Sequence, residues 1–440
     1  MTPKAEDVIV LSPDEFPRYW YNILPDLPES LPPPQNPPTG GDRIAELQQI
    51  MIPECLRMEF SDNRWIPIPD ELREVYIRIG RPRPLMRCRR LERYLKTPAK
   101  LYVKREDMGS PTGSHKINTA LAQAFFAAKA GFEGLVTETG AGQWGSALAY
   151  ATALFDLRCV IFWVRFAYNW KPGRRIFMQL YRGEVHASPS PITEVGRKLL
   201  EKDPNHPGSL SIAISEGLEY ARVHDEFRYA LGSVLNHVLL HQTIIGLETL
   251  LQCEKAGIQP DIMISSLGGG SNFGGFVLPA IGEVLKGKRQ CEFLAAQSLA
   301  APNLVKGEYR YDYADAAGTT PLLKMYTLGH DTEMPVIRAE GLRYHAAAPI
   351  ISYLRYKGIV RAVAYAIDEK EVFEAARILA QTEGITPAPE SAYSAKAAID
   401  EALRCRESGE EKVILFSISG HGFLDLDAYA EKLFKEELRR

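Results

Sequence analysis

The sequence predicts two three-layer α/β domains, in which helices cover parallel sheets, preceded by a proline-rich N-terminal arm. The first observation is length, since 440 residues are too many for one ordinary domain. The second is a regular alternation of short apolar strands and helical patterns from about residue 100 onward. The third is a glycine-rich turn after two of the strands, at the edge of the sheet where such folds place their chemistry.

The strand and helix patterns follow one another along the chain. Strands are expected at residues 100–107, 134–139, 159–164, 184–188, 262–267, 291–297, 360–368 and 412–419. Helices are expected at residues 114–129, 142–155, 171–183, 235–257, 268–285, 369–384 and 391–405. We assign residues 1–95 to the arm and first elements, residues 96–240 to an N-terminal α/β domain, and residues 241–440 to a C-terminal one.

Composition excludes several classes of protein. The formal net charge of -3 gives no basic field for nucleic acid. No apolar run reaches the roughly 18 residues of a membrane span, and the opening "MTPKAEDVIV" shows no secretory signal. The six cysteines have no CxxC spacing, so reduced thiols in the cytoplasm fit better than disulfides or a zinc site.

The N-terminal arm combines many prolines with large apolar side chains. "LPDLPESLPPPQNPP" cannot be a regular helix or a central strand, because proline fixes φ and lacks a donor. A disordered tail would have few aromatic residues, whereas this segment includes Phe16, Tyr19, Trp20, Tyr21 and Ile23. We therefore expect an extended arm packed on the body, with a disordered tail as the alternative.

The stretch "SSLGGGSNFGG" joins the strand at 262–267 to a helix. Three consecutive glycines, Gly268, Gly269 and Gly270, let backbone N–H groups converge on an anion at the helix N-terminus. Ser271 and Asn272 add side-chain donors. The stretch lacks the motifs of nucleotide and dinucleotide sites, so it favours a single phosphate on a small cofactor. A tight strand-to-helix turn is the alternative.

A second glycine-rich turn, "TETGAGQWG", follows the strand at 134–139. Gly140, Ala141 and Gly142 again direct backbone donors toward the start of a helix, where a carboxylate could bind. Glu138 stands at the end of the strand. Its carboxylate could move protons or cap the next helix, and the sequence does not decide between these roles.

Lys116 stands at the start of a helix, where the dipole disfavours a positive charge. Shielding by apolar neighbours should also lower the basicity of its amine, as a nucleophilic amine requires. Together with a turn for a single phosphate, this indicates a Schiff base to pyridoxal phosphate. The alternative is a solvated lysine near a loop.

Two further motifs are ambiguous by themselves. "SISGHG" follows the last strong strand, so Ser419 could bind a cofactor atom or simply mark the end of the strand. "HVLLH" places His237 and His241 on one helix face at metal-ligand spacing. No third ligand accompanies them, which favours ordinary core or surface histidines over a metal site.

Five motifs in order carry a family signature: "GSHKIN", "ETGAGQ", "GGGSN", "EGITPAPES" and "SISGHG". Over roughly residues 75–430 the chain resembles the beta chain of tryptophan synthase, which belongs to the fold-type II pyridoxal phosphate enzymes. "GRPRPL" is similar to the GRPTPL of that family. The proline-rich arm and the "GAGQW" sequence resemble its alternative, second class.

The resemblance implies a set of cofactor contacts. Lys116 forms the Schiff base and moves protons at the substrate Cα. Ser419 faces the pyridine nitrogen, and its neutral hydroxyl favours β-elimination and replacement over transamination. The resemblance also implies further cofactor-binding residues: His115, Asn118, Gly268, Gly269, Gly270, Ser271, Asn272 and Glu390.

The resemblance also implies the substrate contacts and the reaction. Glu138 helps to expel the leaving group and takes up the indole N–H proton. The substrate carboxylate is bound by Thr139, Gly140, Ala141, Gly142 and Gln143. The implied reaction is a β-replacement that joins indole to L-serine or O-phospho-L-serine and gives L-tryptophan. The alternatives are another enzyme of this fold type, such as a serine or threonine deaminase or a threonine synthase, or a non-catalytic paralogue that acts as a binding partner.

Arg343 in "AEGLRYHAAAP" bears on the donor substrate. The family has an acidic residue at the matching place, where it receives the hydroxyl of serine. A guanidinium cannot accept a hydrogen bond, but it suits a phosphate dianion. We therefore expect Arg343 to favour O-phospho-L-serine, with an inter-domain ion pair as the alternative.

The resemblance leaves the assembly only partly specified. It implies a homodimer and allows a monovalent cation, whose backbone ligands leave no sequence pattern. Whether a tryptophan synthase alpha chain binds is an open question at this stage.

Overall fold

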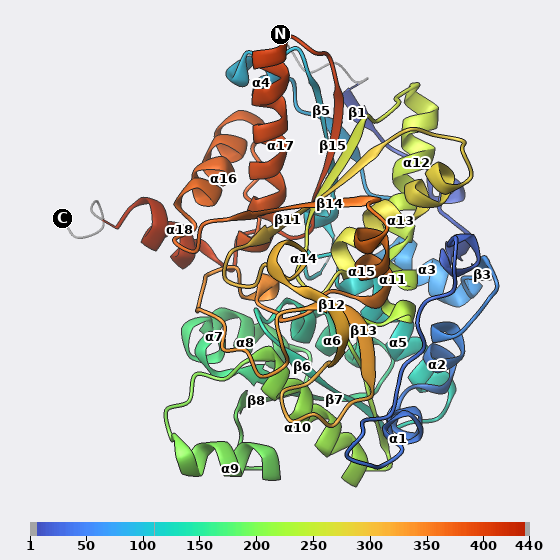
Figure 1. Cartoon of the computed structure of the whole chain (residues 1–440), viewed down its shortest axis with the longest axis vertical. Helices are drawn as coiled ribbons and strands as arrows, with labels where there is room; N and C mark the ends of the chain where they lie inside the picture. The colour runs from blue at the N-terminus through green and yellow to red at the C-terminus, as the bar shows by residue number, and fades with distance from the viewer. Residues whose placement is uncertain (1–6, 110, 436–440) are drawn as a thin grey trace.

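The strands form two large sheets with helices on their faces in the computed structural model, which describes residues 7–109 and 111–435. In Figure 1 the larger sheet occupies the upper half of the molecule and the smaller sheet the lower half. The predicted α/β class is therefore confirmed. The prediction that the opening segment shows no secretory signal concerns, in part, residues 1–6, which lie outside the described residues. No helix within the described residues is long and apolar enough to cross a membrane.

The larger sheet has seven strands within the described residues, and most neighbouring pairs are parallel. In spatial order the strands are β1 (Val8–Ile9), β4 (Leu85–Arg87), β5 (Lys100–Arg105), β15 (Val413–Ile418), β10 (Ile262–Ser266), β11 (Glu292–Ser298) and β14 (Val360–Tyr365). Only β1 with β4 and β4 with β5 pair antiparallel in this sheet. The helices around it are α4 (Arg89–Leu95), α12 (Ile244–Ala256), α13 (Ser271–Leu285), α16 (Lys370–Glu383), α17 (Pro389–Ser408) and α18 (Leu426–Leu433).

β5 belongs to this larger sheet, although the sequence assigned its residues to the N-terminal domain. It pairs in parallel with β15, with Lys100 opposite Val413 and Arg105 opposite Ile418. A parallel strand buried on both faces carries no pattern that identifies its partner, which is why the sequence could not place it. The domain boundaries at residues 95 and 240 remain a prediction.

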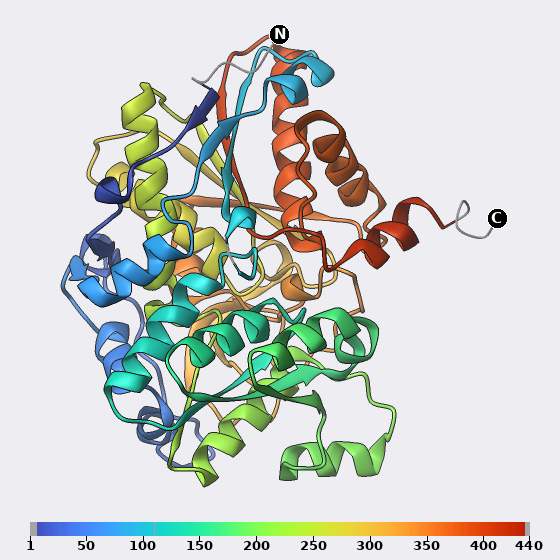
Figure 2. The ribbon, with the colours of Figure 1, turned by 180° about the vertical axis from the view of Figure 1, so that it is seen from behind.

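The smaller sheet has the order β8 (Gly183–Ser188), β7 (Arg158–Val164), β6 (Gly134–Thr139) and β9 (Phe227–Tyr229), all parallel. Figure 2 shows helices α5 and α6 in front of it, and α10 lies on its other face in Figure 1. The helices of this part are α5 (Ile117–Lys129), α6 (Gln143–Leu154), α7 (Arg165–Trp170), α8 (Pro172–Leu180), α9 (Glu194–Lys202) and α10 (Leu210–Val223).

The N-terminal arm packs on the body, as predicted. Phe16, Trp20, Tyr21 and Ile23 are buried in the main core, while Tyr19 is 48% exposed. The Trp20 ring lies 4.8 Å from that of His241. The elements of the arm and its surroundings are η2 (Pro13–Glu15), β2 (Tyr19–Tyr21), η3 (Leu24–Asp26), α1 (Arg43–Ile50), α2 (Pro53–Glu59), β3 (Trp65–Pro67) and α3 (Asp70–Arg78).

The predicted helix at 235–257 is wrong in one respect, because it divides at Thr243 into α11 (Asn236–Gln242) and α12. The Thr243 hydroxyl donates to the carbonyl of Leu240, 2.6 Å away, and accepts from the backbone of Tyr21 in the arm. The break is therefore stabilised by a distant contact. The remaining elements are η4 (Glu106–Met108), α14 (Asn303–Lys306), the hairpin of β12 (Glu308–Tyr313) and β13 (Leu322–Thr327), η5 (Glu340–Leu342) and α15 (Pro349–Tyr356).

Candidate active site

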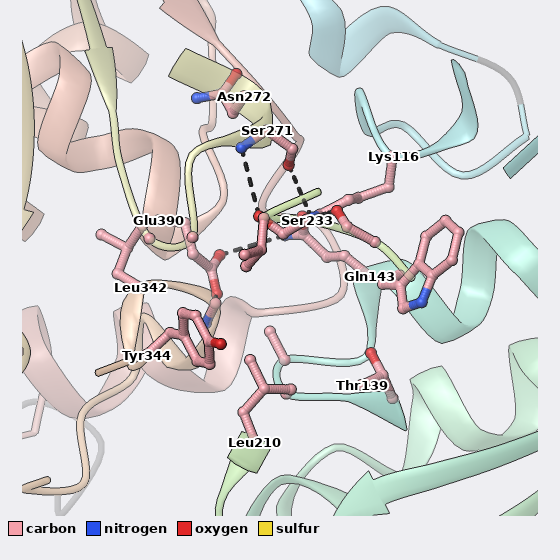
Figure 3. A pocket seen from close by; sticks show the side chains of 18 of the residues that line it. Lys116, Thr139, Gln143, Leu210, Ser233, Ser271, Asn272, Leu342, Tyr344 and Glu390 are labelled. Atoms are coloured by element: carbon pink, nitrogen blue, oxygen red, sulfur yellow. Dashed lines mark hydrogen bonds between the residues drawn. The ribbon is translucent and has the colours of Figure 1, made fainter. Parts of the chain in front are cut away.

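A cavity that is partly open to solvent lies where the carboxyl ends of strands from both sheets meet. Most of the predicted site residues line it. These are His115, Lys116, Glu138, Thr139, Gly140, Ala141, Gln143, Gly268, Gly269, Gly270, Ser271, Asn272, Glu390 and Ser419. Figure 3 shows Lys116, Ser271 and Glu390 converging on this space from three separate parts of the chain.

Lys116 precedes the first residue of α5 and reaches into the cavity. Its Nζ donates to the carbonyl of Gly232 and to Ser271 Oγ, the latter 3.1 Å away (Figure 3). Burial lowers the pKa of Lys116 to about 8, and the nearby carboxylates of Glu138 and Glu390 oppose that change. The neutral amine is therefore still the minor form near pH 7 but is far more abundant than in an ordinary lysine, as a nucleophile requires.

His115 joins the lysine to the opposite wall. Its Nε2 lies 3.4 Å from Ser271 Oγ, and its backbone N–H donates to the Ser419 carbonyl at 2.8 Å. Burial and the Lys116 charge hold the pKa of His115 well below its usual range. The ring is therefore neutral and can donate a hydrogen bond to an anion at one nitrogen only.

The turn between β10 and α13 forms one end of the cavity. α13 begins at Ser271, and the residue before it, Gly270, provides no side-chain cap. A Cβ at Gly269 would lie 2.5 Å from Ser233 Oγ, and a Cβ at Gly268 would lie 2.4 Å from the Gly341 carbonyl. Glycine is therefore required for this close packing, which leaves the helix N-terminus open to an anion.

The second glycine-rich turn leads from β6 into α6, where the Thr139 hydroxyl accepts from the backbone N–H of Gly145 at 3.1 Å and the glycine before the helix provides no side-chain cap. Gly142, just before α6, has a φ of +91°, a conformation that favours glycine. Its neighbours Gly140 and Ala141 line the cavity, whereas Gly142 itself is not among the lining residues. Two helix N-termini, each preceded by a glycine, thus lie at one cavity, the arrangement expected for two anionic groups.

Glu138 ends on the cavity wall and does not cap α6. Its Oε2 accepts a hydrogen bond of 2.5 Å from the hydroxyl of Tyr229. Burial raises the pKa of Glu138 to about 7, against the opposing effect of the Tyr229 hydrogen bond and the Lys116 charge. A carboxylate with this pKa can both accept and return a proton near neutral pH.

Glu390 and Gln143 connect the second turn to the C-terminal half. Gln143 Nε2 lies 3.3 Å from Glu390 Oε2 (Figure 3), and the backbone N–H of Gly341 donates to Glu390 Oε1 at 3.0 Å. Burial raises the pKa of Glu390. Ser419, on the same side, shares a 2.6 Å hydrogen bond with Ser391.

Besides Gly142, two predicted site residues do not line the cavity. Asn118 is buried, with Oδ1 accepting from Arg81 and Nδ2 donating to Gln242, so its amide is already used by the protein. Arg343 Nη1 forms an ion pair with Glu340, 3.0 Å away, within its own turn of chain. This ion pair is local rather than inter-domain. Arg343 nevertheless directly follows Gly341 and Leu342, which line the cavity.

His237 and His241 are both buried in the core. His237 Nδ1 lies 2.8 Å from Glu59 Oε2, and His241 Nδ1 lies 3.1 Å from Thr119 Oγ1. Neither residue lines the cavity. Across residues 7–109 and 111–435, no group of three or more His, Cys, Asp or Glu side chains could hold a metal ion.

Comparison with known proteins agrees with this geometry. Residues 78–420 match the family model described as pyridoxal-phosphate dependent enzyme. A "Tryptophan synthase beta chain 2" of Methanothermobacter thermautotrophicus is 55% identical over 97% of this chain and 98% of its own. Relatives of the same name in Aquifex aeolicus and, as "Tryptophan synthase beta chain", in Pyrococcus horikoshii are 54% and 53% identical, over 97% and 96% of this chain and 98% and 92% of theirs. The chain belongs to the tryptophan synthase beta chain family of pyridoxal-phosphate-dependent enzymes.

The overall fold extends beyond this family. Maize serine racemase has a similar structure, with a TM-score of 0.56 over 83% of this chain and 98% of that one, at 17% sequence identity. At that identity the likeness concerns the fold alone. It is consistent with the arrangement of two sheets around a cavity described above.

The residues that line the cavity fit pyridoxal phosphate. The N-terminus of α13 suits its phosphate, and Lys116 Nζ lies within hydrogen-bond distance of Ser271 in that same turn. The Ser419 side chain lies on the cavity wall, available to a ring atom. A single small cofactor could therefore contact the amine, the phosphate turn and Ser419 together.

Several residues of the site were missed by sequence analysis. Tyr229, Gly232 and Ser233 lie on or after the short strand β9, which the sequence pattern left irregular. Ser233 Oγ accepts from the backbone N–H of Ser271 at 3.4 Å, and Gly232 accepts from Lys116. A glycine and a serine directly after an aromatic strand could have indicated this segment.

Proposed function

We propose that this chain joins indole to a serine-type donor and releases L-tryptophan. The observation that carries the proposal is the single cavity that Lys116 and Glu138 both line, with pKa values near neutrality, between the N-termini of α6 and α13. Such an arrangement can bind a phosphate and a carboxylate and move protons between them. The names of relatives at 53–55% identity support the same reaction.

Pyridoxal phosphate, when bound, supplies an electron sink for loss of the Cα proton and of the β-substituent. The start of α13 would hold its phosphate, and Lys116 would move the proton at Cα. The start of α6 would bind the substrate carboxylate, which orients the donor. Glu138 would transfer a proton to the leaving group and later accept the indole N–H proton. Apolar side chains of the cavity wall would exclude water and contact indole: Leu210, Ile214, Leu231 and Leu342.

A donor panel tests this function. The protein is incubated with L-serine, O-phospho-L-serine or L-threonine, each with and without indole, and the products are separated. We expect tryptophan only when indole is present. Keto acid as the main product in the presence of indole would instead indicate a deaminase. A protein that binds the cofactor but converts no donor would indicate a non-catalytic paralogue.

We further propose O-phospho-L-serine as the preferred donor, because of Arg343. Its guanidinium is held beside the cavity-lining segment by Glu340, and a donor phosphate would compete with that carboxylate for it. If the phosphate contact contributes roughly 1.5–3 kcal/mol, the preference is on the order of 10- to 100-fold. Arg343→Ala should abolish the preference, whereas Glu340→Gln, which releases the guanidinium, should increase it.

The measurement is kcat/KM for both donors at saturating indole in the wild type and the two variants. A wild-type preference for serine would refute the proposal about the donor. If Arg343→Ala still prefers O-phospho-L-serine, another residue determines the donor specificity. Neither result would affect the assignment of tryptophan formation.

A homodimer, an alpha-chain partner, a monovalent cation and a cytoplasmic location also belong to the proposal. All six cysteines are free, which suits a reducing compartment. Light scattering of the purified protein with and without an alpha chain would test the assembly. Activity in sodium, potassium and a large organic cation would test the ion, and fractionation of the source cells would test the location.

A further inference from the structure

Tyr229 is the only one of the described residues whose side-chain hydroxyl lies within 2.5 Å of the Glu138 carboxylate. It ends β9, which pairs in parallel with β6, so that Tyr229 stands opposite Val136. The side chain is buried, and its ring packs against Gly217, where an added Cβ would lie 3.0 Å from the ring. Strand pairing and ring packing together fix the hydroxyl on one oxygen of Glu138.

The other groups around Tyr229 and Glu138 interact with the Glu138 carboxylate less directly than the Tyr229 hydroxyl does. The positive charge of Lys116, which directly precedes α5, lowers the pKa of Glu138. The Thr137 hydroxyl, from β6, makes only a weak contact of 3.4 Å with the Glu138 carboxylate. The hydroxyl of Tyr344, on the segment after η5, donates to the carbonyl of Ala314. The negative charge of Asp315 acts on Tyr229 through its electrostatic effect. The Tyr229 hydroxyl therefore gives Glu138 its shortest direct hydrogen bond from a side chain.

We propose that Tyr229 is a positioning residue for the reaction, which holds Glu138 in the ionised form and fixes its orientation toward the substrate. This inference rests on the proposed role of Glu138. A phenol donates a stronger hydrogen bond to a carboxylate than to a neutral carboxyl group, so the contact favours the charged form. Burial alone would keep Glu138 protonated at neutral pH, and a protonated carboxyl cannot take the indole proton.

The sign of the expected change follows directly. Removing the hydroxyl removes an interaction that lowers the pKa of Glu138, so the pKa rises above about 7. For a hydrogen bond to a charged group the shift is about one to two units. The ionised fraction at pH 7, and with it the rate of tryptophan formation, should fall about 5- to 50-fold. Raising the pH should restore the rate.

The first measurement does not depend on activity. The infrared band of the protonated Glu138 carboxyl is identified by its absence in Glu138→Gln. Its intensity is then followed as a function of pH in the wild-type holoenzyme and in Tyr229→Phe. Tyr429→Phe is the matched control, since it also loses a buried phenol hydroxyl, bonded at 2.6 Å to the Pro387 carbonyl, far along the chain from Glu138. We expect the titration to move upward in Tyr229→Phe only.

The second measurement is the pH profile of kcat/KM for indole. In Tyr229→Phe its acid limb should move upward by the same amount as the infrared titration, while KM for the donor amino acid stays constant. Replacing Tyr229 by 3-fluorotyrosine retains the ring and the hydroxyl but makes the phenol more acidic. This stronger donor should move the infrared titration and the acid limb of the rate profile to lower pH. Because fluorotyrosine packs almost as tyrosine does, it also tests the inference if Tyr229→Phe does not fold.

Three results would overturn the inference: an unchanged infrared titration in Tyr229→Phe, a loss of rate that high pH does not restore, or an upward shift with fluorotyrosine. Each would mean that Tyr229 only packs against the site. Failure of the wild type to form tryptophan would instead refute the proposed function, and the infrared titration would still report on the Tyr229 contact.

Discussion

Two lysines of the same region, Lys104 and Lys116, differ in what surrounds the amine. Lys104 on β5 is fully buried, and its Nζ donates to Glu248 at 2.8 Å, to Gln252 at 2.9 Å and to the Arg83 carbonyl at 2.7 Å. Lys116 is partly exposed to the cavity and donates to a carbonyl and a hydroxyl. Among the described side chains, no carboxylate lies within ion-pair distance of Lys116.

Burial lowers the pKa of both amines, yet only one of them can react. Lys104 is enclosed by three acceptors and holds elements together, whereas Lys116 lacks a carboxylate partner and faces a space large enough for a ligand. What makes a buried lysine reactive here is therefore the missing partner and the open space, not burial itself.

The largest expected effect separates the two lysines chemically. Lys116→Ala should reduce tryptophan formation to background and abolish the covalent cofactor link, while the fold survives. Reduction of the wild-type holoenzyme with borohydride, followed by peptide mapping, should place the cofactor on the peptide that contains Lys116. Label on Lys104 or on any other lysine would contradict the comparison.

The next effect separates them by stability. Lys104→Met leaves Glu248 with only Arg81 as its charged partner, so the free energy of unfolding should fall by about 3 kcal/mol, the lower end for a broken buried ion pair. Lys116→Met strands no carboxylate and removes a charge that burial disfavours, so it should leave the free energy of unfolding unchanged or raise it. Urea denaturation of both cofactor-free variants measures the difference. Equal losses would mean that both lysines are structural.

Glu138 tests whether the charges near Lys116 act in chemistry rather than in structure. Glu138→Gln should retain the cofactor and the stability of the wild type but form tryptophan at least ~100-fold more slowly, the lower end of general acid–base contributions. Rapid-mixing absorbance would show donor binding unchanged. Near-normal turnover would leave Glu138 without a catalytic role.

The smallest effect is a pH dependence of stability. The unfolded chain binds a proton on residue 116 up to a pH of about 10.4, whereas the folded amine releases it near the pKa of about 8. The unfolded state therefore holds more protons between these values, and the free energy of unfolding rises with pH. The free energy of unfolding of Lys116→Met should not show this rise. The difference in free energy of unfolding between the variant and the cofactor-free wild type should therefore narrow by about 1 to 2 kcal/mol from pH 8 to 10. A constant difference would mean that the amine is not shifted.

Sequence alone could predict the parts of the site that depend on local structure. A glycine-rich turn between a strand and a helix is recognisable from a few residues, so the sequence could predict that both turns and Glu138 at a strand end lie at one site, and residues of all three line the cavity. Tyr229 could not be found in this way, because its role depends on β9 pairing with β6, and β9 has only three residues. The neighbours of Asn118 and Arg343 depend on side-chain contacts, Arg81 and Glu340, that no motif records.

The position of β15 also has a consequence for how the molecule is assembled during synthesis. β15, near the end of the chain, lies in the middle of the larger sheet, between β5 and β10. All strands of the smaller sheet, by contrast, have left the ribosome by residue 229. The smaller sheet can therefore form while translation continues, but the larger sheet stays in two halves with unpaired edges until residue 418 emerges. Because Ser419 directly follows β15, the active site cannot be completed before that strand has been synthesised.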